Sequence, residues 1–299
     1  MKFRFESLKI ALKTALKEWW TKDPFKESAV IAYYAIFALP GLLVVIVSVA
    51  GIFFGKEAVN GQIAGQITST MGADTAVQIQ EIIAKASESK NSVIANILGI
   101  LTILLGATGV FIQFQKSLNT IWEVKADESK SGIISILKAR LFSFGIIVAT
   151  AFILIVSLVV SATLAAFGTW VIKHFSESFI ILLQIVNFII SLSIIALLFA
   201  LMYKTFPDAK IKWRHVWIGS FLTAILFEIG KFALGFYFGK AEPGSGYGAA
   251  GSSVLILLWV SYSSMIVFYG AEFTHAYAEL KDGKIAPDEN AVKQVAPKV

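Results

Sequence analysis

Two ionisable residues interrupt a long apolar stretch of this sequence. Glu228 and Lys231 lie three positions apart, between Phe227 and Phe232. If the stretch crosses a bilayer as a helix, both side chains share one face and can neutralise each other, because a lone charge at the bilayer centre costs about 2.5–3.5 kcal/mol. The pair is either an ion, proton or headgroup site facing a cavity, or an ion pair that fixes helix packing. The sequence leaves both interpretations open.

A glycine-rich, nearly uncharged segment at 243–253 is the second candidate for a binding site. It contains Tyr247, Gly248, Gly251 and Ser252. Glycine backbone bends tightly, can approach a ligand closely and can enter a cavity within a membrane. A helix that begins near Ser252 would also present free N–H groups to an anion. The alternative is a flexible hairpin outside the membrane.

Three other residues each have a functional and a simpler interpretation. Glu272, close to His275, lies at the inner end of an apolar stretch, where it is either part of a site or an acid at the headgroup level. Arg140 begins another apolar stretch, and we expect its long side chain to snorkel toward water. Pro40 removes a backbone hydrogen bond, so it either bends a helix for packing or frees carbonyl groups as ligands.

The sequence predicts neither a metal site nor a catalytic site. It has no cysteine, and its three histidines fall on different segments that cannot form one zinc site. The H-E-x-x-H, G-x-S-x-G and phosphate-binding glycine–lysine patterns are absent. We therefore predict that the chain is not an enzyme and needs no cofactor. The loop at 204–214 is basic, but membrane topology accounts for this charge, and we predict no nucleic-acid partner.

The elements that must position these residues are membrane helices. Of the 299 residues, 57% are hydrophobic and 15% are charged, against about 25% charged in a soluble domain. A span needs about 20 mostly apolar residues, and six stretches qualify. The predicted spans cover residues 29–54, 93–115, 139–168, 179–203, 217–239 and 252–274. The predicted fold is thus an all-α, polytopic membrane protein.

The distribution of Lys and Arg predicts the orientation of these spans. With the N-terminus in the cytoplasm, the inner segments are 1–28, 116–140, 204–216 and 275–299. They hold twenty of the 26 Lys and Arg residues, the outer segments hold five, and Lys231 lies within a span. Because inner loops of membrane proteins are enriched in Lys and Arg, we predict that both termini are cytoplasmic.

The segments outside the membrane domain at 29–274 have their own signals. Residues 1–28 form a predicted amphipathic helix with an apolar face and an adjacent row of lysines. These residues are Phe5, Leu8, Leu12, Leu16 and Trp19 on the apolar face, and Lys9, Lys13 and Lys17 in the row. Such a helix either lies on the membrane, with its lysines at anionic headgroups, or packs beneath the bundle.

Two further segments lie between or after the spans. The outer loop at 55–92 is predicted to contain an amphipathic helix capped near Asp74, with a plain surface loop as the alternative. Residues 275–299 are predicted to be a disordered cytoplasmic tail. Gly235 and Gly239 allow close helix contact, either within the chain or in a homo-oligomer.

Three motifs carry a resemblance to a known family. They are Ala32–Pro40 in the first span, Leu118–Trp122 after the second, and a late run of Tyr247, Gly248, Gly251, Ser252, Trp259 and Glu272. Over about residues 10–280 the chain resembles the YihY/BrkB family of bacterial inner-membrane proteins, described as virulence factor BrkB-like. Many members have a second proline where this chain has Gly41, so this chain departs from the family pattern at that position.

This resemblance implies six spans in the bacterial inner membrane, but no settled activity. The family once carried the label ribonuclease BN, which is regarded as misassigned, and the absence of a nuclease site here agrees with that view. It also implies that Tyr247, Glu272 and the other residues of the late run matter, either for folding or for transport, and we expect a structural role for Trp259. We expect a transport protein for an ion, a small solute or a lipid. The alternative is a scaffold or envelope-assembly factor that transports nothing.

Overall fold

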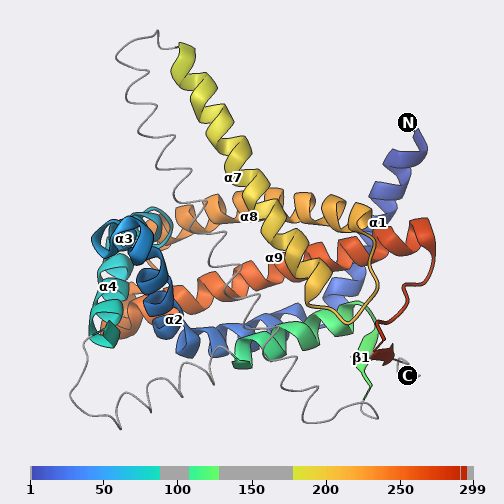
Figure 1. Cartoon of the computed structure of the whole chain (residues 1–299), viewed down its shortest axis with the longest axis horizontal. Helices are drawn as coiled ribbons and strands as arrows, with labels where there is room; N and C mark the ends of the chain where they lie inside the picture. Colours follow the sequence, from blue (N-terminus) through green and yellow to red (C-terminus); the bar gives the residue numbers. More distant parts are fainter. Residues whose placement is uncertain (1, 88–107, 128–177, 290, 295–299) are drawn as a thin grey trace.

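The structure is a computed structural model that describes residues 2–87, 108–127, 178–289 and 291–294 (Figure 1). Arg140, the predicted third span and most of the predicted second span lie outside these residues. The first half of the described chain contains α1 (Lys2–Thr21), α2 (Pro24–Phe54), α3 (Lys56–Met71), α4 (Ala73–Ser87), a helix over 108–121 and β1 (Val124–Ala126). The second half contains α7 (Ser178–Thr205), α8 (Trp213–Ala241), the 3-10 helix η2 (Ser245–Ala250), α9 (Gly251–Asp282) and β2 (Ala291–Lys293).

Among the described residues, three helices are long and apolar enough to cross a membrane. They are the Ile185–Thr205 part of α7, the whole of α8 and the whole of α9. These helices contain or overlap the fourth, fifth and sixth predicted spans. The first predicted span lies within α2, which continues as one helix through Pro40.

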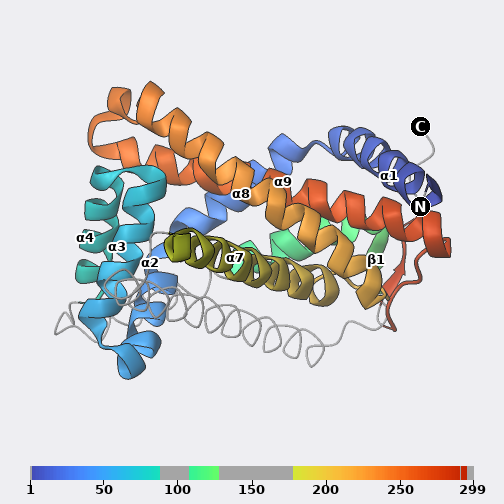
Figure 2. The same ribbon diagram turned by 90° about the horizontal axis from the view of Figure 1, so that it is seen from above.

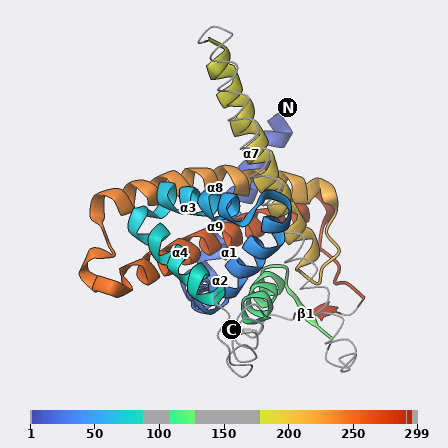
Figure 3. The same cartoon turned by 60° about the vertical axis from the view of Figure 1, so that its left-hand side comes forward.

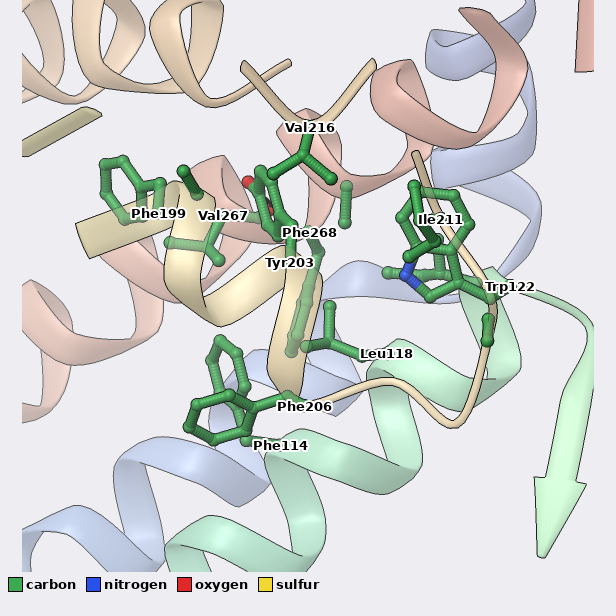
Figure 4. Close-up of a cluster of buried hydrophobic side chains, with 14 of the residues drawn as sticks. Phe114, Leu118, Trp122, Phe199, Tyr203, Phe206, Ile211, Val216, Val267 and Phe268 are labelled. Carbon is green, nitrogen blue, oxygen red and sulfur yellow. Dashed lines mark hydrogen bonds between the residues drawn. The ribbon is translucent and has the colours of Figure 1, made fainter. Parts of the chain in front are cut away.

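α9 is the central helix of the described bundle. α1, α2 and α8 all pack against it, and α7 packs against α8 (Figures 1 and 2). The largest apolar core forms where the helix over 108–121 meets α7, α8 and α9 (Figure 4). Leu118, Trp122 and Tyr203 are fully buried there. Burial of this apolar surface by helices from both halves of the chain holds the bundle together.

The close approach of α8 to α9 depends on two glycines. A Cβ atom at Gly219 would collide with the side chain of Thr274, and one at Gly270 would collide with Thr223 and Tyr203. Small residues allow helices to pack with their backbones close together. Gly239, which we expected at such a contact, has no described atom within 4 Å of its would-be Cβ, so the contact lies elsewhere on α8.

Three predicted inner segments meet at one end of the bundle, which we call the strand end. β1 pairs antiparallel with β2, and Lys125 lies opposite Val292. Lys210 N donates to Ala286 O at 2.9 Å, and Asp288 N donates to Asp208 O at 2.9 Å. These contacts join residues 124–126, 208–210, 286–289 and 291–293 into one layer.

The C-terminal segment differs from the predicted disordered tail at 275–299. α9 continues to Asp282, eight residues beyond the predicted end of the span. Asp282 then binds Lys212 at 2.9 Å and His215 at 2.8 Å, at the beginning of α8. The prediction was wrong for the described part of this segment, because its order comes from contacts with distant segments.

The opposite end, which we call the hairpin end, is formed by α3, α4 and η2. α3 and α4 lie against each other and over the ends of α8 and α9 (Figure 3). Ile79 and Ile83 of α4 are buried against Val47 of α2 and Ile256 of α9. The predicted helix in the loop at 55–92 is therefore present as α4, and it begins at Ala73, one residue before Asp74.

Candidate functional site

The turn between α1 and α2 brings charged groups against α9. α1 runs antiparallel to α9, since Lys281 Nζ donates to Ser7 Oγ at 3.1 Å and Trp19 Nε1 donates to Met265 O at 3.1 Å. The packing face of α1 includes Ala11 and Ala15, both fully buried. The chain turns after Thr21 with Asp23 in a left-handed conformation, and Pro24 begins α2. Lys22 therefore lies on a short linker.

Glu272 of α9 is buried beside this linker. Its side chain is 2% exposed, and Lys22 Nζ lies 2.9 Å from Glu272 Oε1 as an ion pair, without the directional geometry of a hydrogen bond. Lys22 Nζ also donates to Ile121 O at 3.3 Å. We had considered Glu272 as an acid at the headgroup level. The structure instead encloses it in the protein, where an unpaired carboxylate would be strongly disfavoured.

A small pocket adjoins this ion pair and contains a second carboxylate. Its volume is about 40 Å³, and its polar lining consists of Lys22, Glu27, Ser117, Thr120 and Glu272. Glu27 Oε2 accepts hydrogen bonds from Ser117 Oγ at 2.6 Å and from Gln113 Nε2 at 2.8 Å. The rest of the lining is Trp19, Pro24, Ile121 and Phe268.

The pocket combines oxygen ligands with a small excess of negative charge. Two carboxylates and one ammonium group line it, so it carries one net negative charge when all three groups are ionised. Among the described residues no group of three His, Cys, Asp or Glu side chains is placed to hold a metal ion. The chemistry fits a small, singly charged cation or a proton better than it fits a transition metal.

His275, one turn after Glu272, is buried rather than close to water. Its ring meets the ring of Trp122 edge-on, with 5.2 Å between the centroids, and its Nε2 lies 3.8 Å from Glu279 Oε1. This places a further titratable group beside the site, although it does not line the pocket.

Glu228 and Lys231 form the ion pair that their spacing predicts. Lys231 Nζ lies 2.6 Å from Glu228 Oε2, and the two side chains are 33% and 9% exposed, respectively. Neither residue lines the pocket beside Glu272. The two charged pairs are therefore separate features, one within α8 and one between α9 and the α1–α2 linker.

The glycine-rich segment lies at the hairpin end, far from Glu272. Ser252 and Glu272 are twenty residues apart on α9, or roughly 30 Å at about 1.5 Å per residue.

Gly248 has a φ of 52°, and Gly251 packs closely on the backbone of Gly244. The Ser252 hydroxyl donates to the side-chain oxygen of Gln78 in α4. Tyr247 is 60% exposed. The late motif thus supplies residues to two ends of α9.

The remaining predicted structural residue, Trp259, packs between helices. Its ring meets the ring of Phe227 on α8 edge-on, with centroids 6.5 Å apart. Lys22, Glu27 and Ser117 were not predicted as site residues. The one sequence feature that could have indicated them is that Lys22 and Glu27 come just before the first predicted span. Charged residues at that position are common at membrane interfaces, so this feature is not specific.

Long apolar helices around a buried charged pocket define an α-helical membrane protein. Residues 15–294 match the virulence factor BrkB family, and the chain belongs to that family. The resemblance seen in the sequence is thereby confirmed.

Three relatives show how far the similarity extends. A UPF0761 membrane protein of Pseudoalteromonas atlantica is 27% identical over 82% of this chain and 78% of its own length. Those of Saccharophagus degradans and Stenotrophomonas maltophilia are 26% and 24% identical, over 88% and 86% of this chain. The match spans only 58% of the length of each of the latter two. No solved structure matches this chain.

Proposed function

We propose that the protein crosses the bacterial cytoplasmic (inner) membrane six times, with both termini in the cytoplasm. The contacts at the two ends of the bundle support this topology. Parts of three segments predicted to be cytoplasmic meet at the strand end, and α1 packs on the same part of α9. α4 and the glycine-rich segment, both predicted to be outside, meet at the hairpin end. Contacts between a segment predicted to be cytoplasmic and a segment predicted to be outside would argue against this orientation.

We propose further that the protein transports a small ion or solute, and that the pocket at Glu272 is part of the path. The observation that carries this proposal is the enclosed carboxylate of Glu272 beside a small pocket that is also lined by Lys22 and Glu27. For stability alone, replacing a buried ion pair with apolar residues is often neutral or favourable by about 1–4 kcal/mol. Charges within membrane helices therefore suggest a function.

Two other places along the bundle are candidates for the same path. Glu228 and Lys231 lie near the middle of α8, and Tyr247, Gly248, Gly251 and Ser252 lie at the hairpin end. With the pocket at Glu272 they place polar groups at three different depths. A continuous polar path would require groups at each of these depths.

A flux assay in proteoliposomes tests the transport proposal. Wild-type protein should release a gradient of Na⁺, K⁺ or H⁺, or move a labelled lipid, faster than empty liposomes. Glu272→Gln should lower this flux by more than about tenfold, because a hydrogen bond or ion pair to a charged group contributes about 1.5–3 kcal/mol. Glu57→Gln, at an exposed position of α3, is the matched control and should keep the wild-type flux. Equal flux in both variants would contradict the assignment of Glu272.

Membrane lipids are the partner that the surface of α1 supports. Leu12, Leu16 and Trp20 are exposed beside exposed Lys9, Lys13 and Lys17. We propose that this surface contacts anionic headgroups at the cytoplasmic face, where each lysine contributes about 1 kcal/mol. In the same proteoliposomes, replacing the three lysines with glutamine should remove any dependence of flux on anionic lipid. A dependence that persists would contradict this contact.

The alternative of a scaffold or envelope-assembly factor is favoured by one observation. Glu228 is closed onto Lys231 at 2.6 Å and is nearly buried, as expected of an ion pair that fixes packing. If this function is correct, the proteoliposomes show no flux for any of the probes, and crosslinking before purification recovers a stable protein partner. Flux that is sensitive to Glu272→Gln would exclude it.

A further inference from the structure

The pocket beside Glu272 contains residue types that are found in cation sites. In this structure the cation beside Glu272 is the ammonium group of Lys22. The pocket lining includes two residues with carboxylate groups, Glu27 and Glu272, and two with hydroxyl groups, Ser117 and Thr120. Two hydrogen bonds from Gln113 and Ser117 fix the carboxylate of Glu27. The positive charge comes from Lys22, whose ammonium group lies 2.9 Å from Glu272 Oε1.

Lys22 can leave this position more easily than Glu272 can. Lys22 follows the last residue of α1 and precedes the left-handed turn at Asp23, and its side chain is 22% exposed. Its long stem can therefore carry the ammonium group into water. Glu272 is fixed within α9 and is 2% exposed. If Lys22 leaves, the enclosed carboxylate needs another cation, because a buried charge without a partner is strongly disfavoured.

We propose that this pocket binds one monovalent metal cation, Na⁺ or K⁺, which displaces the ammonium group of Lys22 from Glu272. Oxygen ligands from Glu27, Glu272, Ser117 and Thr120 suit such a hard cation. The pocket volume of about 40 Å³ has room for a partly hydrated ion, since one water needs about 10–15 Å³. One monovalent ion replaces the single positive charge of Lys22 beside the carboxylates of Glu27 and Glu272, so the net charge of the pocket is the same before and after the exchange. The inference rests on the proposed transport function and names its substrate class.

Exchange between two cations gives each state of the site a defined charge balance. In the first state Lys22 neutralises Glu272, and its ammonium group takes the place of the metal ion beside that carboxylate. In the second state the metal ion neutralises Glu272, and Lys22 is solvated. No state leaves the enclosed carboxylate unpaired, so the protein can alternate between them without the full cost of a buried charge.

Thermal unfolding of the purified protein tests the site without any flux measurement. NaCl or KCl should raise the melting temperature above that in choline chloride at equal ionic strength. Lys22→Met removes the competing charge but keeps an apolar stem, so it should lower the melting temperature in choline. In NaCl or KCl the variant should recover, with an apparent Kd for the cation at least about tenfold lower than that of wild type.

Two carboxylate variants and one control complete the experiment. Glu272→Gln and Glu27→Gln should each lose the difference between metal cations and choline, and the second variant serves if the first does not fold. Asp282→Asn removes a paired carboxylate at the strand end, outside the pocket, and should keep the difference. An equal melting temperature in NaCl, KCl and choline, for both wild type and Lys22→Met, would overturn the cation site.

Failure of the cation site and failure of the transport function are distinguishable. A cation-dependent melting temperature without flux in proteoliposomes would leave the binding site standing and exclude transport. Flux with a melting temperature that ignores the cation would leave transport standing and remove Na⁺ and K⁺ as ligands of this pocket. Flux carried by protons alone, with no metal-dependent shift, is an instance of the second outcome.

Discussion

At the scale of single residues, several buried polar groups tie α9 to other parts of the chain. Glu272 faces Lys22 on the α1–α2 linker. Tyr203 on α7 donates to Val267 O at 2.7 Å, and its hydroxyl lies 3.0 Å from that of Thr223 on α8. Because these groups are buried, loss of one partner leaves the other without a hydrogen bond or counter-charge. α9 is thus fixed in position by specific polar contacts as well as by packing.

Gly270 is a residue at which this arrangement leaves no room for a larger side chain. Gly270→Ala should destabilise the protein by about 1–3 kcal/mol, because overpacking forces neighbouring side chains to move. The new methyl group would displace the hydroxyl groups of Thr223 and Tyr203 from their hydrogen bond. Thermal or denaturant unfolding in detergent measures the change.

Gly239→Ala is the matched control for this prediction. No described atom lies within 4 Å of the added methyl group, and alanine is favoured over glycine within a helix by about 1 kcal/mol. The control should therefore be as stable as wild type or slightly more stable. Equal stability of the Gly270 and Gly239 variants would show that the α8–α9 contact is not limited by size.

At this scale the sequence predicts a contact only when the two residues are close along one helix. Glu228 and Lys231 are three residues apart, so helical geometry alone predicts their pairing, and the structure confirms it. Lys22 and Glu272 meet only because α1 runs antiparallel to α9. No local pattern specifies that packing, and the second carboxylate of the pocket, Glu27, was missed for the same reason.

At the scale of elements, α9 is longer than a membrane is thick. Its 32 residues span about 48 Å at about 1.5 Å per residue, against a hydrocarbon core of about 30 Å. The residues Phe273, Ala276 and Tyr277 near its end are buried against Ala11 and Ala15 of α1. The end of α9 therefore packs against α1, and the two helices together enclose Glu272.

The antiparallel pairing of β1 with β2 can be tested by a disulfide. Lys125 and Val292 lie directly opposite each other, and opposite residues of an antiparallel pair have Cα atoms about 4.5–5.5 Å apart, within the range of a disulfide. The double variant Lys125→Cys and Val292→Cys should crosslink within the chain on mild oxidation. Because the wild-type chain has no cysteine, a mobility shift on a non-reducing gel reports this bond alone.

The control for the disulfide keeps one cysteine and moves the other. Lys125→Cys combined with Lys284→Cys places the second thiol in the segment between α9 and β2, outside the paired register, and should remain reduced. Crosslinking of equal yield in both double variants would mean that the C-terminal segment is not held in the register of β2.

Long elements were predictable from the sequence, and short ones were not. The apolar runs that predict spans at 179–203, 217–239 and 252–274 lie within or overlap α7, α8 and α9, because a chain that crosses lipid must satisfy its own backbone hydrogen bonds, as a helix does. β1 and β2 have three residues each, and such short strands form only when distant segments bring them together. The same reason explains the incorrect prediction of disorder around them.

At the scale of the whole molecule, the two ends of the bundle differ in charge and in structure. The strand end gathers the loop before α8, the C-terminal segment and β1, where Asp282 binds Lys212, Arg214 and His215. The hairpin end consists of α3, α4 and the glycine-rich η2, with the Ser252–Gln78 contact between them. Since Lys and Arg are retained on the cytoplasmic side during insertion, this asymmetry predicts which end faces the cytoplasm.

Single cysteines at the two ends test this orientation, because the natural chain contains none. Tyr247→Cys lies at an exposed position of the hairpin end, and Lys284→Cys lies at an exposed position of the strand end. In cells whose outer barrier has been opened but whose inner membrane is intact, a membrane-impermeant maleimide should label the cysteine at 247 and leave the one at 284 unlabelled. Permeabilising the inner membrane should expose the second to the same extent as the first. The reverse pattern would place each end on the opposite side of the membrane. The Lys22–Glu272 pocket would then lie near the outer surface. A transported cation would meet Lys22 on entering from outside rather than on leaving for the cytoplasm.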